Sequence, residues 1–193
     1  MKQLIFASNN AHKAHEIRAL LNNRFDIITL KEAGIFIDIP EPHATLEENA
    51  SEKSLTIYKL TNKDCFSEDS GLEVEALAGE PGVKSARYAG EKASAEENNA
   101  LLLKKMENIS NRNAQFKTVI SLIMDGKEMM FEGVCEGSIA LQPSGNGGFG
   151  YDPLFIPKGY DKTFAELGIE VKSLISHRKK AIELMNQFFK KCS

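Results

Sequence analysis

The order of apolar patterns constrains the fold of this chain more than any other feature of the sequence. Residues 3–7 predict a buried strand, which a helical pattern over 11–22 and a second strand over 25–30 follow. Later, the strand patterns at 115–124 and 128–140 flank Asp125-Gly126, a strong hairpin signal. Alternation of strands and helices is typical of a parallel sheet, whereas a hairpin adds an antiparallel pair. We therefore expect an α/β fold on a mixed sheet.

Capping patterns and turn residues place the other expected elements. Thr45 and Glu48 form a capping box before a helix over about 46–62, and Ser94 and Glu97 form another before a helix to about 109. The remaining elements are strands at 64–67 and 72–76 around the acidic turn 68–71, a glycine-rich loop at 144–150, a strand at 153–156, and a C-terminal helix beginning between 170 and 177.

Composition narrows the class of protein. We expect the 193 residues to form a single domain over 1–193, since no linker, repeat or low-complexity tract interrupts them. The net charge of −3 argues against general nucleic-acid binding. Three cysteines without a CxxC pair argue against a disulfide framework. The N-terminus has only four apolar residues before it turns polar, so we expect no signal peptide or membrane span, and a reduced cytoplasm.

Cations interrupt the apolar stripes of three predicted helices. Lys53 falls in the middle of the stripe formed by Leu46, Ala50, Ile57 and Leu60. Lys13 lies on the face of Ile17, Leu20 and Leu21, and His177 and Arg178 flank the stripe of Leu174, Ala181, Met185 and Phe188. One such cation is as easily a side chain snorkelling from the edge of a core. Three of them near helix N-termini favour a shared anionic ligand.

Polar residues elsewhere fit a phosphate and metal site. Ser8-Asn9-Asn10 joins a strand to a helix, where backbone N–H groups bind phosphate, although a simple N-cap by Asn10 explains it equally well. Glu68 and Asp69 share a predicted turn, and turn acids are usually just solvated. Glu41 lies between two prolines in a rigid extended segment. Glu41 and Asp69 together suffice for Mg²⁺, which takes one or two carboxylates plus substrate phosphates.

Two familiar motifs are not supported. Residues 145–150 match G-x-G-x-x-G but lead into a strand instead of opening a helix, so the dinucleotide fingerprint is rejected. The loop more plausibly presents Phe149 for stacking on a base and Asp152 as an acceptor for ring N–H groups. His12 and His15 are expected to be solvent-exposed. The sequence contains no P-loop motif.

In combination, these elements resemble the Ham1/RdgB family of inosine/xanthosine triphosphate pyrophosphatases over residues 4 to 185. The motifs that carry the resemblance are Ser8 to Lys13, Glu48-Asn49-Ala50 with Lys53, Glu68 to Leu72, Pro81-Gly82-Val83 with Ser85 to Tyr88, Gly147 to Pro153, and Lys172 with Ser176-His177-Arg178. This sequence departs from the pattern at Glu68, where many relatives have Asp, and at Asn9, where some have Gly.

The resemblance implies an elongated mixed sheet flanked by helices, with two lobes around a central cleft, and a homodimer. It implies that Asp69 is the catalytic acid, binding Mg²⁺ and activating water, with Glu41 as a second metal ligand; Glu68 leaves open which acid of the pair is the base. The implied substrate-binding positions are Ser8, Asn9, Asn10, Ala11, His12, Lys13, Lys53 and Ser70 for the phosphates and sugar, and Phe149, Gly150, Tyr151, Asp152, Lys172, His177 and Arg178 around the base.

The expected reaction is Mg²⁺-dependent cleavage of ITP, dITP or XTP to the monophosphate and pyrophosphate. Lys172 and Arg178 can only donate hydrogen bonds, which suits the 6-oxo group of hypoxanthine and xanthine and disfavours the 6-amino group of adenine. Two alternatives stay open: a non-catalytic nucleotide sensor, and a hydrolase for pyrimidine or modified nucleotides like the Maf-like proteins. The Phe149 to Asp152 and Ser176 to Arg178 motifs favour the purine enzyme.

Overall fold

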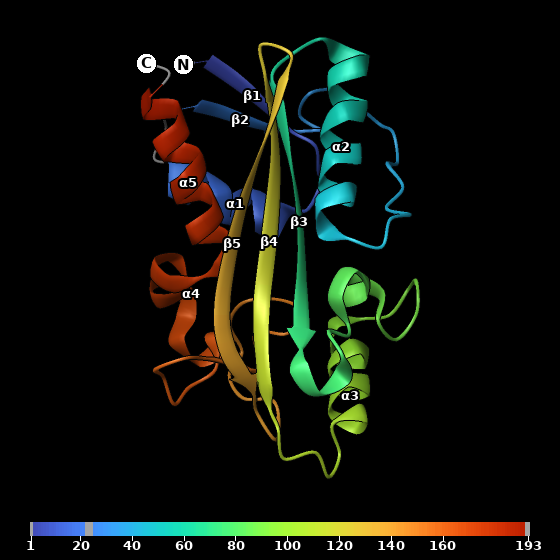
Figure 1. The fold of residues 1–193 in the computed structure, drawn as a ribbon, viewed down its shortest axis with the longest axis vertical. Coiled ribbons are helices and arrows are strands. Elements are labelled where there is room, and N and C mark those ends of the chain that lie inside the picture. Colours follow the sequence, from blue (N-terminus) through green and yellow to red (C-terminus); the bar gives the residue numbers. More distant parts are fainter. Residues whose placement is uncertain (1, 22–24, 192–193) are drawn as a thin grey trace. The chain divides into compact units, whose positions relative to one another are not determined.

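The protein is described here by a computed structural model, which covers residues 2–21 and 25–191. Six strands form one mixed sheet in the order β2-β1-β3-β4-β5-β6 (Figure 1). β1 (Lys2–Phe6) runs parallel to β2 (Phe25–Thr29) and to β3 (Cys65–Val74). β5 (Lys127–Ile139) runs antiparallel to β6 (Phe155–Pro157), and β4 (Asn113–Met124) lies between β3 and β5. The predicted α/β fold on a mixed sheet is therefore confirmed.

The chain divides into two compact units. The first consists of Met1–Asp69, Thr118–Gly133 and Arg178–Ser193, and the second of Ser70–Lys117 and Val134–His177. β3, β4 and β5 contribute residues to both.

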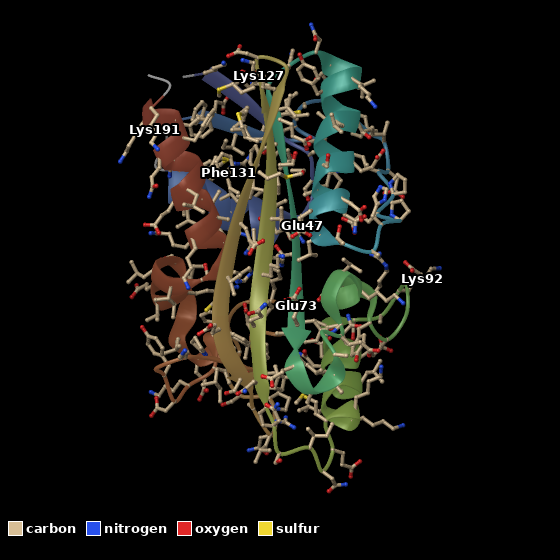
Figure 2. All side chains as sticks on the ribbon, viewed as in Figure 1. Glu47, Glu73, Lys92, Lys127, Phe131 and Lys191 are labelled. Carbon is tan, nitrogen blue, oxygen red and sulfur yellow. The ribbon has the colours of Figure 1, made fainter. Side chains whose placement is uncertain are left out.

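In the first unit, the sheet has helices on both faces. Alternate residues of β1 point to opposite sides: Leu4 and Phe6 join one core cluster, whereas Ile5 joins another, together with Ala7 directly after the strand. The first cluster includes side chains of α1 (Ala11–Leu21) and α5 (His177–Lys191), and the second includes Ile57 of α2 (Leu46–Thr61). Phe131 of β5 packs on α5, with ring centroids 5.9 Å from Phe188 (Figure 2). α1 and α2 are thus held on opposite faces of β1.

In the second unit, a separate core joins β3, β4 and β5 to two helices. Its buried side chains include Leu72 and Phe116 of the strands, Leu102 of α3 (Ala95–Lys105) and Phe164 of α4 (Phe164–Ile175). Two short 3₁₀ helices, η1 (Glu75–Leu77) and η2 (Gly82–Arg87), follow β3. Sequence periodicity did not indicate either of them.

Helix starts follow the capping patterns. Ser94 and Glu97 form a complete capping box, as predicted. Thr45 Oγ1 accepts a hydrogen bond from the Glu48 amide, but the Thr45 hydroxyl itself donates to the Glu48 carboxylate, so only the first half of the predicted box is seen there. α3 ends at Lys105, short of the expected 109. Another complete capping box, formed by Thr163 and Glu166, starts α4.

The predicted C-terminal helix begins at His177, within the expected range of 170 to 177, but its extension back to Leu174 is wrong. The segment is two helices, α4 and α5, because Ser176 between them adopts an extended conformation, with φ −65° and ψ 159°. Leu174 therefore belongs to α4, where it is 71% exposed, and not to the apolar stripe of α5.

The predicted turn at residues 68–71 is also wrong, since β3 runs without interruption through them. Glu68 and Asp69 are buried, which two adjacent carboxylates tolerate only when cations neutralise them. Gly71 is required for packing: a Cβ atom there would lie 2.4 Å from the Gly82 carbonyl oxygen. Gly71, which suggested a turn, is instead the position where the backbone of η2 packs directly against β3.

Candidate active site

The first unit holds a buried cluster of charged side chains around Lys53. Lys53 Nζ donates to Glu41 Oε1 at 2.6 Å, to Asp69 Oδ1 at 2.9 Å and to the Glu68 carbonyl oxygen at 3.0 Å. Lys53 is only 7% exposed, so the cation predicted within an apolar stripe does lie in the protein interior. It joins the two carboxylates that the sequence suggested as metal ligands.

Neighbouring polar contacts fix the position of Lys53. Ser67 of β3 donates to the Ala50 carbonyl oxygen, and the Cys65 thiol lies 3.3 Å from the carbonyl oxygen of Ser54. These contacts tie α2 to β3 on both sides of Lys53. The backbone of this residue is therefore anchored on both sides.

Asn49 similarly fixes the segment that carries Glu41. Its fully buried amide accepts a hydrogen bond from the His43 N–H at 3.0 Å and donates to the His43 carbonyl at 3.2 Å. The two bonds clamp the backbone two residues after Glu41. Asn49 was noted in the sequence only as part of a family motif, and its buried clamp could not be inferred from spacing.

A second group of buried charges surrounds Glu68. Arg178 donates from Nε to Glu68 Oε2 at 2.8 Å and from Nη2 to Glu68 Oε1 at 2.6 Å, a bidentate pair. Arg178 Nη1 also donates to Glu16, and Lys13 Nζ lies 3.5 Å from Glu68 Oε1. Glu16, on α1, was not foreseen. Its side chain is buried because Arg178 neutralises it.

Burial and charge act in opposite directions on these groups. Burial raises the pKa of the Asp69 carboxyl, and outweighs the lowering effect of Lys53 and Lys13. Burial works against the Lys53 ammonium, but the charges of Asp69 and Glu41 outweigh it and raise the pKa of Lys53. For Arg178, Glu68 and Glu16 likewise outweigh burial and raise its pKa. Lys53 and Arg178 are therefore permanent cations at neutral pH.

The Ser8-Asn9-Asn10 segment caps α1. Asn10 Oδ1 accepts from the Lys13 amide at 3.0 Å, Ser8 Oγ accepts from the Asn10 amide at 3.1 Å, and Asn9 Oδ1 accepts from the Lys31 amide at 2.8 Å. Asn10 is thus an N-cap, as the simpler interpretation predicted. Ala11 opens the helix, and His12 and His15 are exposed, as expected.

The second unit holds the other predicted group, around Asp152. Asp152 Oδ2 accepts from Lys172 Nζ at 2.7 Å and from the Phe149 amide at 2.9 Å, and Lys172 Nζ lies 4.5 Å from the centroid of the Phe149 ring. Asp152 and Lys172 are both buried, whereas Phe149 is half-buried. A Cβ atom on Gly148 would lie 2.1 Å from Asp152 Oδ2, so the glycine loop is shaped around this carboxylate.

Two hydrogen bonds hold the loop that contains Phe149. Asn99 of α3 donates from Nδ2 to the Gly150 carbonyl at 3.2 Å, and the Tyr151 hydroxyl donates to the Ser85 carbonyl at 2.9 Å. Elsewhere in the second unit, His177 stacks on Phe116, with ring centroids 4.7 Å apart. The sequence analysis did not identify Asn99 as a functional residue. Its position three residues before the buried Leu102 places it on the same side of α3, and a polar residue on a buried helix face is a signal for such a role.

The structure therefore sorts the predicted residues into two sets. Lys13, Lys53, Arg178, Glu41 and Asp69 share the cluster of the first unit, with Ser8 to His12 at the start of α1. Phe149 to Asp152, Lys172 and His177 belong to the second unit, as does Ser70, which directly follows Asp69 in β3. Arg178, which the resemblance places around the base, donates to Glu68 and Glu16.

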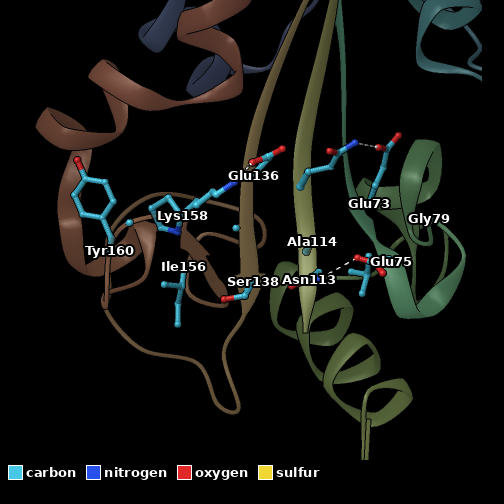
Figure 3. A pocket seen from close by; sticks show the side chains of 15 residues that line it. Glu73, Glu75, Gly79, Asn113, Ala114, Glu136, Ser138, Ile156, Lys158 and Tyr160 are labelled. Carbon is cyan, nitrogen blue, oxygen red and sulfur yellow. Dashed lines mark hydrogen bonds and ion pairs between the residues drawn. The ribbon is translucent and has the colours of Figure 1, made fainter. Parts of the chain in front are cut away.

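A separate cavity of about 730 Å³ lies in the second unit (Figure 3). Its acidic side chains have partners: Gln115 donates to Glu73 at 2.7 Å, and Lys158 to Glu136 at 2.7 Å. None of the predicted site residues is among its lining residues.

Within residues 2–21 and 25–191, no group of three or more His, Cys, Asp or Glu is arranged to hold a metal ion. A cation at Glu41 and Asp69 would thus depend on further oxygen ligands, such as phosphates. The same residues contain no helix long and apolar enough to cross a membrane. The lysine in the middle of α2, buried between two carboxylates, makes this cluster the candidate active site.

Comparison with known proteins identifies the family. The sequence profile of the Ham1 family matches residues 4–188, and the chain therefore belongs to the Ham1 family. It is 49% identical over 181 residues to a dITP/XTP pyrophosphatase of Flavobacterium johnsoniae, with 94% of each chain covered. It is 48% identical over 189 residues to a dITP/XTP pyrophosphatase of Porphyromonas gingivalis, with 97% of each chain covered.

A solved structure agrees with this assignment. The Ham1 protein of Staphylococcus aureus superposes with a TM-score of 0.91 at 42% identity, covering 100% of both chains. The likeness extends over the mixed sheet and its helices, and confirms the fold expected from the sequence motifs.

Proposed function

We propose that this protein is a Mg²⁺-dependent nucleoside-triphosphate pyrophosphatase that hydrolyses ITP, dITP and XTP to the monophosphate and pyrophosphate. The observation that carries the proposal is the buried Lys53, which joins Glu41 and Asp69 in one cluster. The relatives named dITP/XTP pyrophosphatases, at up to 49% identity over nearly the full chain, support the substrate class.

The donor set suits Mg²⁺. Glu41 Oε1 and Asp69 Oδ1 both lie within 3 Å of one point, the Lys53 nitrogen, so a single small cation could contact both. Mg²⁺ prefers oxygen ligands and commonly binds through one or two carboxylates plus substrate phosphates. When bound, it would polarise the phosphate and lower the pKa of a coordinated water.

Asp69 is the better candidate for the general base. Burial raises the pKa of Asp69 in the direction of neutral pH, and a general base works most effectively when its pKa lies near the working pH. The Glu68 carboxylate, in contrast, is held by two parallel bonds from Arg178. This difference supports Asp69 for the role that the sequence left open between the two acids.

The cations have the complementary role of binding the triphosphate. Lys13 and Lys53 neutralise phosphate charge, and the first-turn N–H groups of α1, near Ala11 and His12, point away from the helix as in other phosphate sites. The same cations stabilise the leaving pyrophosphate. Phe149, Asp152 and Lys172 recognise the base, with the Lys172 ammonium as a donor toward a 6-oxo group. We also propose a cytoplasmic homodimer, as the family resemblance implies.

One experiment tests the reaction. A panel of ITP, XTP, ATP, GTP and UTP is assayed with Mg²⁺ or EDTA, with pyrophosphate and orthophosphate measured separately. ITP and XTP should release pyrophosphate only with Mg²⁺, and ¹⁸O-water should label the monophosphate. Orthophosphate as the first product would refute the assignment. Binding without turnover would indicate a nucleotide sensor, and preference for UTP a pyrimidine hydrolase.

A matched pair of variants tests the base. Asp69→Asn should lower kcat on the order of 10²–10⁴-fold, the usual effect of losing a general base, with metal loss adding to it. Glu68→Gln should lower it much less. The reverse ranking would assign the base to Glu68.

A further inference from the structure

The Lys53 ammonium contacts the carboxylate oxygens proposed above as ligands of the divalent cation. Three oxygen atoms, from Glu41, Asp69 and the Glu68 carbonyl, lie 2.6 to 3.0 Å from Nζ. Two of them are the carboxylate oxygens assigned above to the metal. The side chain is 7% exposed, so its charge is compensated mainly by these protein groups.

The two cations cannot share these oxygens in this arrangement. Mg²⁺ binds oxygen at about 2.0–2.1 Å, so an ion on the two carboxylate oxygens that Nζ contacts would be an immediate neighbour of the ammonium. Contact and charge repulsion between an ammonium and a divalent ion at such a separation would be severe. One of them must therefore leave before the other can occupy the site.

Lys53 is suited to move away from the Glu41 and Asp69 oxygens. The bonds from Ser67 and Cys65 to α2 hold its backbone, while the lysine stem has four rotatable bonds. A phosphate oxygen offers an alternative partner for the ammonium. We infer that Lys53 is an exchangeable counter-ion: it compensates the charge of the Glu41 and Asp69 carboxylates, and yields them to the divalent cation as it moves to the triphosphate. This inference rests on the proposed metal site.

Without a bound metal ion, the Lys53 ammonium compensates the charge of the two buried carboxylates. Metal binding and phosphate binding are then coupled through one side chain, since each favours the same movement of Lys53.

Lys13 provides a matched control. It forms its ion pair with Glu68 at 3.5 Å and influences Asp69 through charge alone. Removing Lys13 deletes the same charge from the same cluster without freeing the oxygens of Glu41 and Asp69.

The test is binding of Mn²⁺ alone, measured by electron paramagnetic resonance, to wild type, Lys53→Met and Lys13→Met. Lys53→Met should tighten the Kd for Mn²⁺ by about tenfold or more, because it removes a direct competitor. Lys13→Met should tighten it by about twofold, the effect of a more distant charge. Circular dichroism establishes that each variant is folded, and Lys53→Gln replaces Lys53→Met if the latter is not.

A measurement on the wild type gives a second readout. In ¹H–¹⁵N spectra of lysine ammonium groups, the Lys53 signal, assigned by its loss in Lys53→Met, should shift or broaden when Mg²⁺ is added. Equal tightening in both variants, or an unchanged Lys53 signal at saturating Mg²⁺, would overturn the exchange while leaving the metal site intact. If no variant and no wild-type protein binds Mn²⁺, the proposed metal site fails, and the exchange with it.

Discussion

Replacing Arg178 by Met should destabilise the protein strongly, because it leaves two buried carboxylates without their cation. Arg178 is 1% exposed and bonds to both Glu68 and Glu16, which are 1% and 8% exposed. Removing one partner of a buried ion pair typically costs about 3–5 kcal/mol, a large fraction of the 5–15 kcal/mol that stabilises most proteins. Lys13, 3.5 Å from Glu68, compensates only part of this charge.

Urea unfolding followed by circular dichroism measures the effect. With a slope of about 2 kcal/mol per molar, a loss of about 4 kcal/mol lowers the midpoint by roughly 2 M. The matched control is Lys179→Met at the neighbouring position, where the lysine pairs with Glu183, which is about half exposed. That substitution should change stability by no more than about 0.5 kcal/mol.

A second substitution isolates the pairing from the general loss of packing. Adding Glu68→Gln to Arg178→Met removes one of the two uncompensated charges, that of Glu68, and should recover at least about 1 kcal/mol. The reasoning is refuted if Arg178→Met costs less than about 1 kcal/mol, or if the double variant is no more stable than the single one.

A different variant at this position, Arg178→Lys, separates two roles for Arg178. A residue that positions Glu68 should, when removed, lower kcat/KM for ITP and ATP in parallel, so that their ratio holds. A residue that donates to the base, as the family resemblance implies, should instead lose ITP activity selectively. Measuring both substrates with the most conservative folded variant, Arg178→Lys, distinguishes the two.

Three further predictions concern other parts of the chain. Lys172→Met leaves Asp152 buried without its ion pair and removes a donor, so the ITP/ATP ratio of kcat/KM should fall about tenfold or more; an unchanged ratio would mean that backbone groups of the 147–152 loop read the base. Asn99→Asp turns an acceptor toward the Gly150 carbonyl, and should raise KM for ITP several-fold with a smaller change in kcat; a fall in kcat alone would argue against a role in holding this loop. Burial raises the pKa of the Cys65 thiol to about 12, so at pH 8 iodoacetamide should modify it only after unfolding; rapid labelling of its peptide in the native protein would contradict the buried environment.

The fold was largely predictable because local signals agreed with one another. Capping boxes at Thr45 and Ser94 gave two helix starts, and Asp125-Gly126 gave the hairpin between β4 and β5. The box at Thr163 and Glu166 was equally visible in the sequence, and recognising it would have placed the start of α4. The break at Ser176 was harder to foresee, since no glycine or proline marks it.

The errors in β3 have a different cause. Two adjacent acids followed by Ser-Gly usually mark an exposed turn, because burying unpaired carboxylates is costly. Here the required cations come from Lys13, Lys53 and Arg178, which are distant from Asp69 in the sequence. Spacing within a segment cannot reveal such long-range compensation. That Lys53 lies on the buried face of its helix was nevertheless predictable, because apolar residues precede and follow it along that face.

The balance of charge in the cluster bears on the order in which ligands bind. Three cations, Lys13, Lys53 and Arg178, accompany four carboxylates, those of Glu16, Glu41, Glu68 and Asp69. These named side chains are therefore negative by one charge when all are ionised, and they repel a triphosphate. A divalent cation makes the same group positive by one and, on the exchange proposed above, directs Lys53 toward the phosphates. It follows that metal and nucleotide should bind cooperatively, with the metal converting an acidic cluster into an anion site. The reciprocal expectation is that a bound triphosphate tightens metal binding by the same factor.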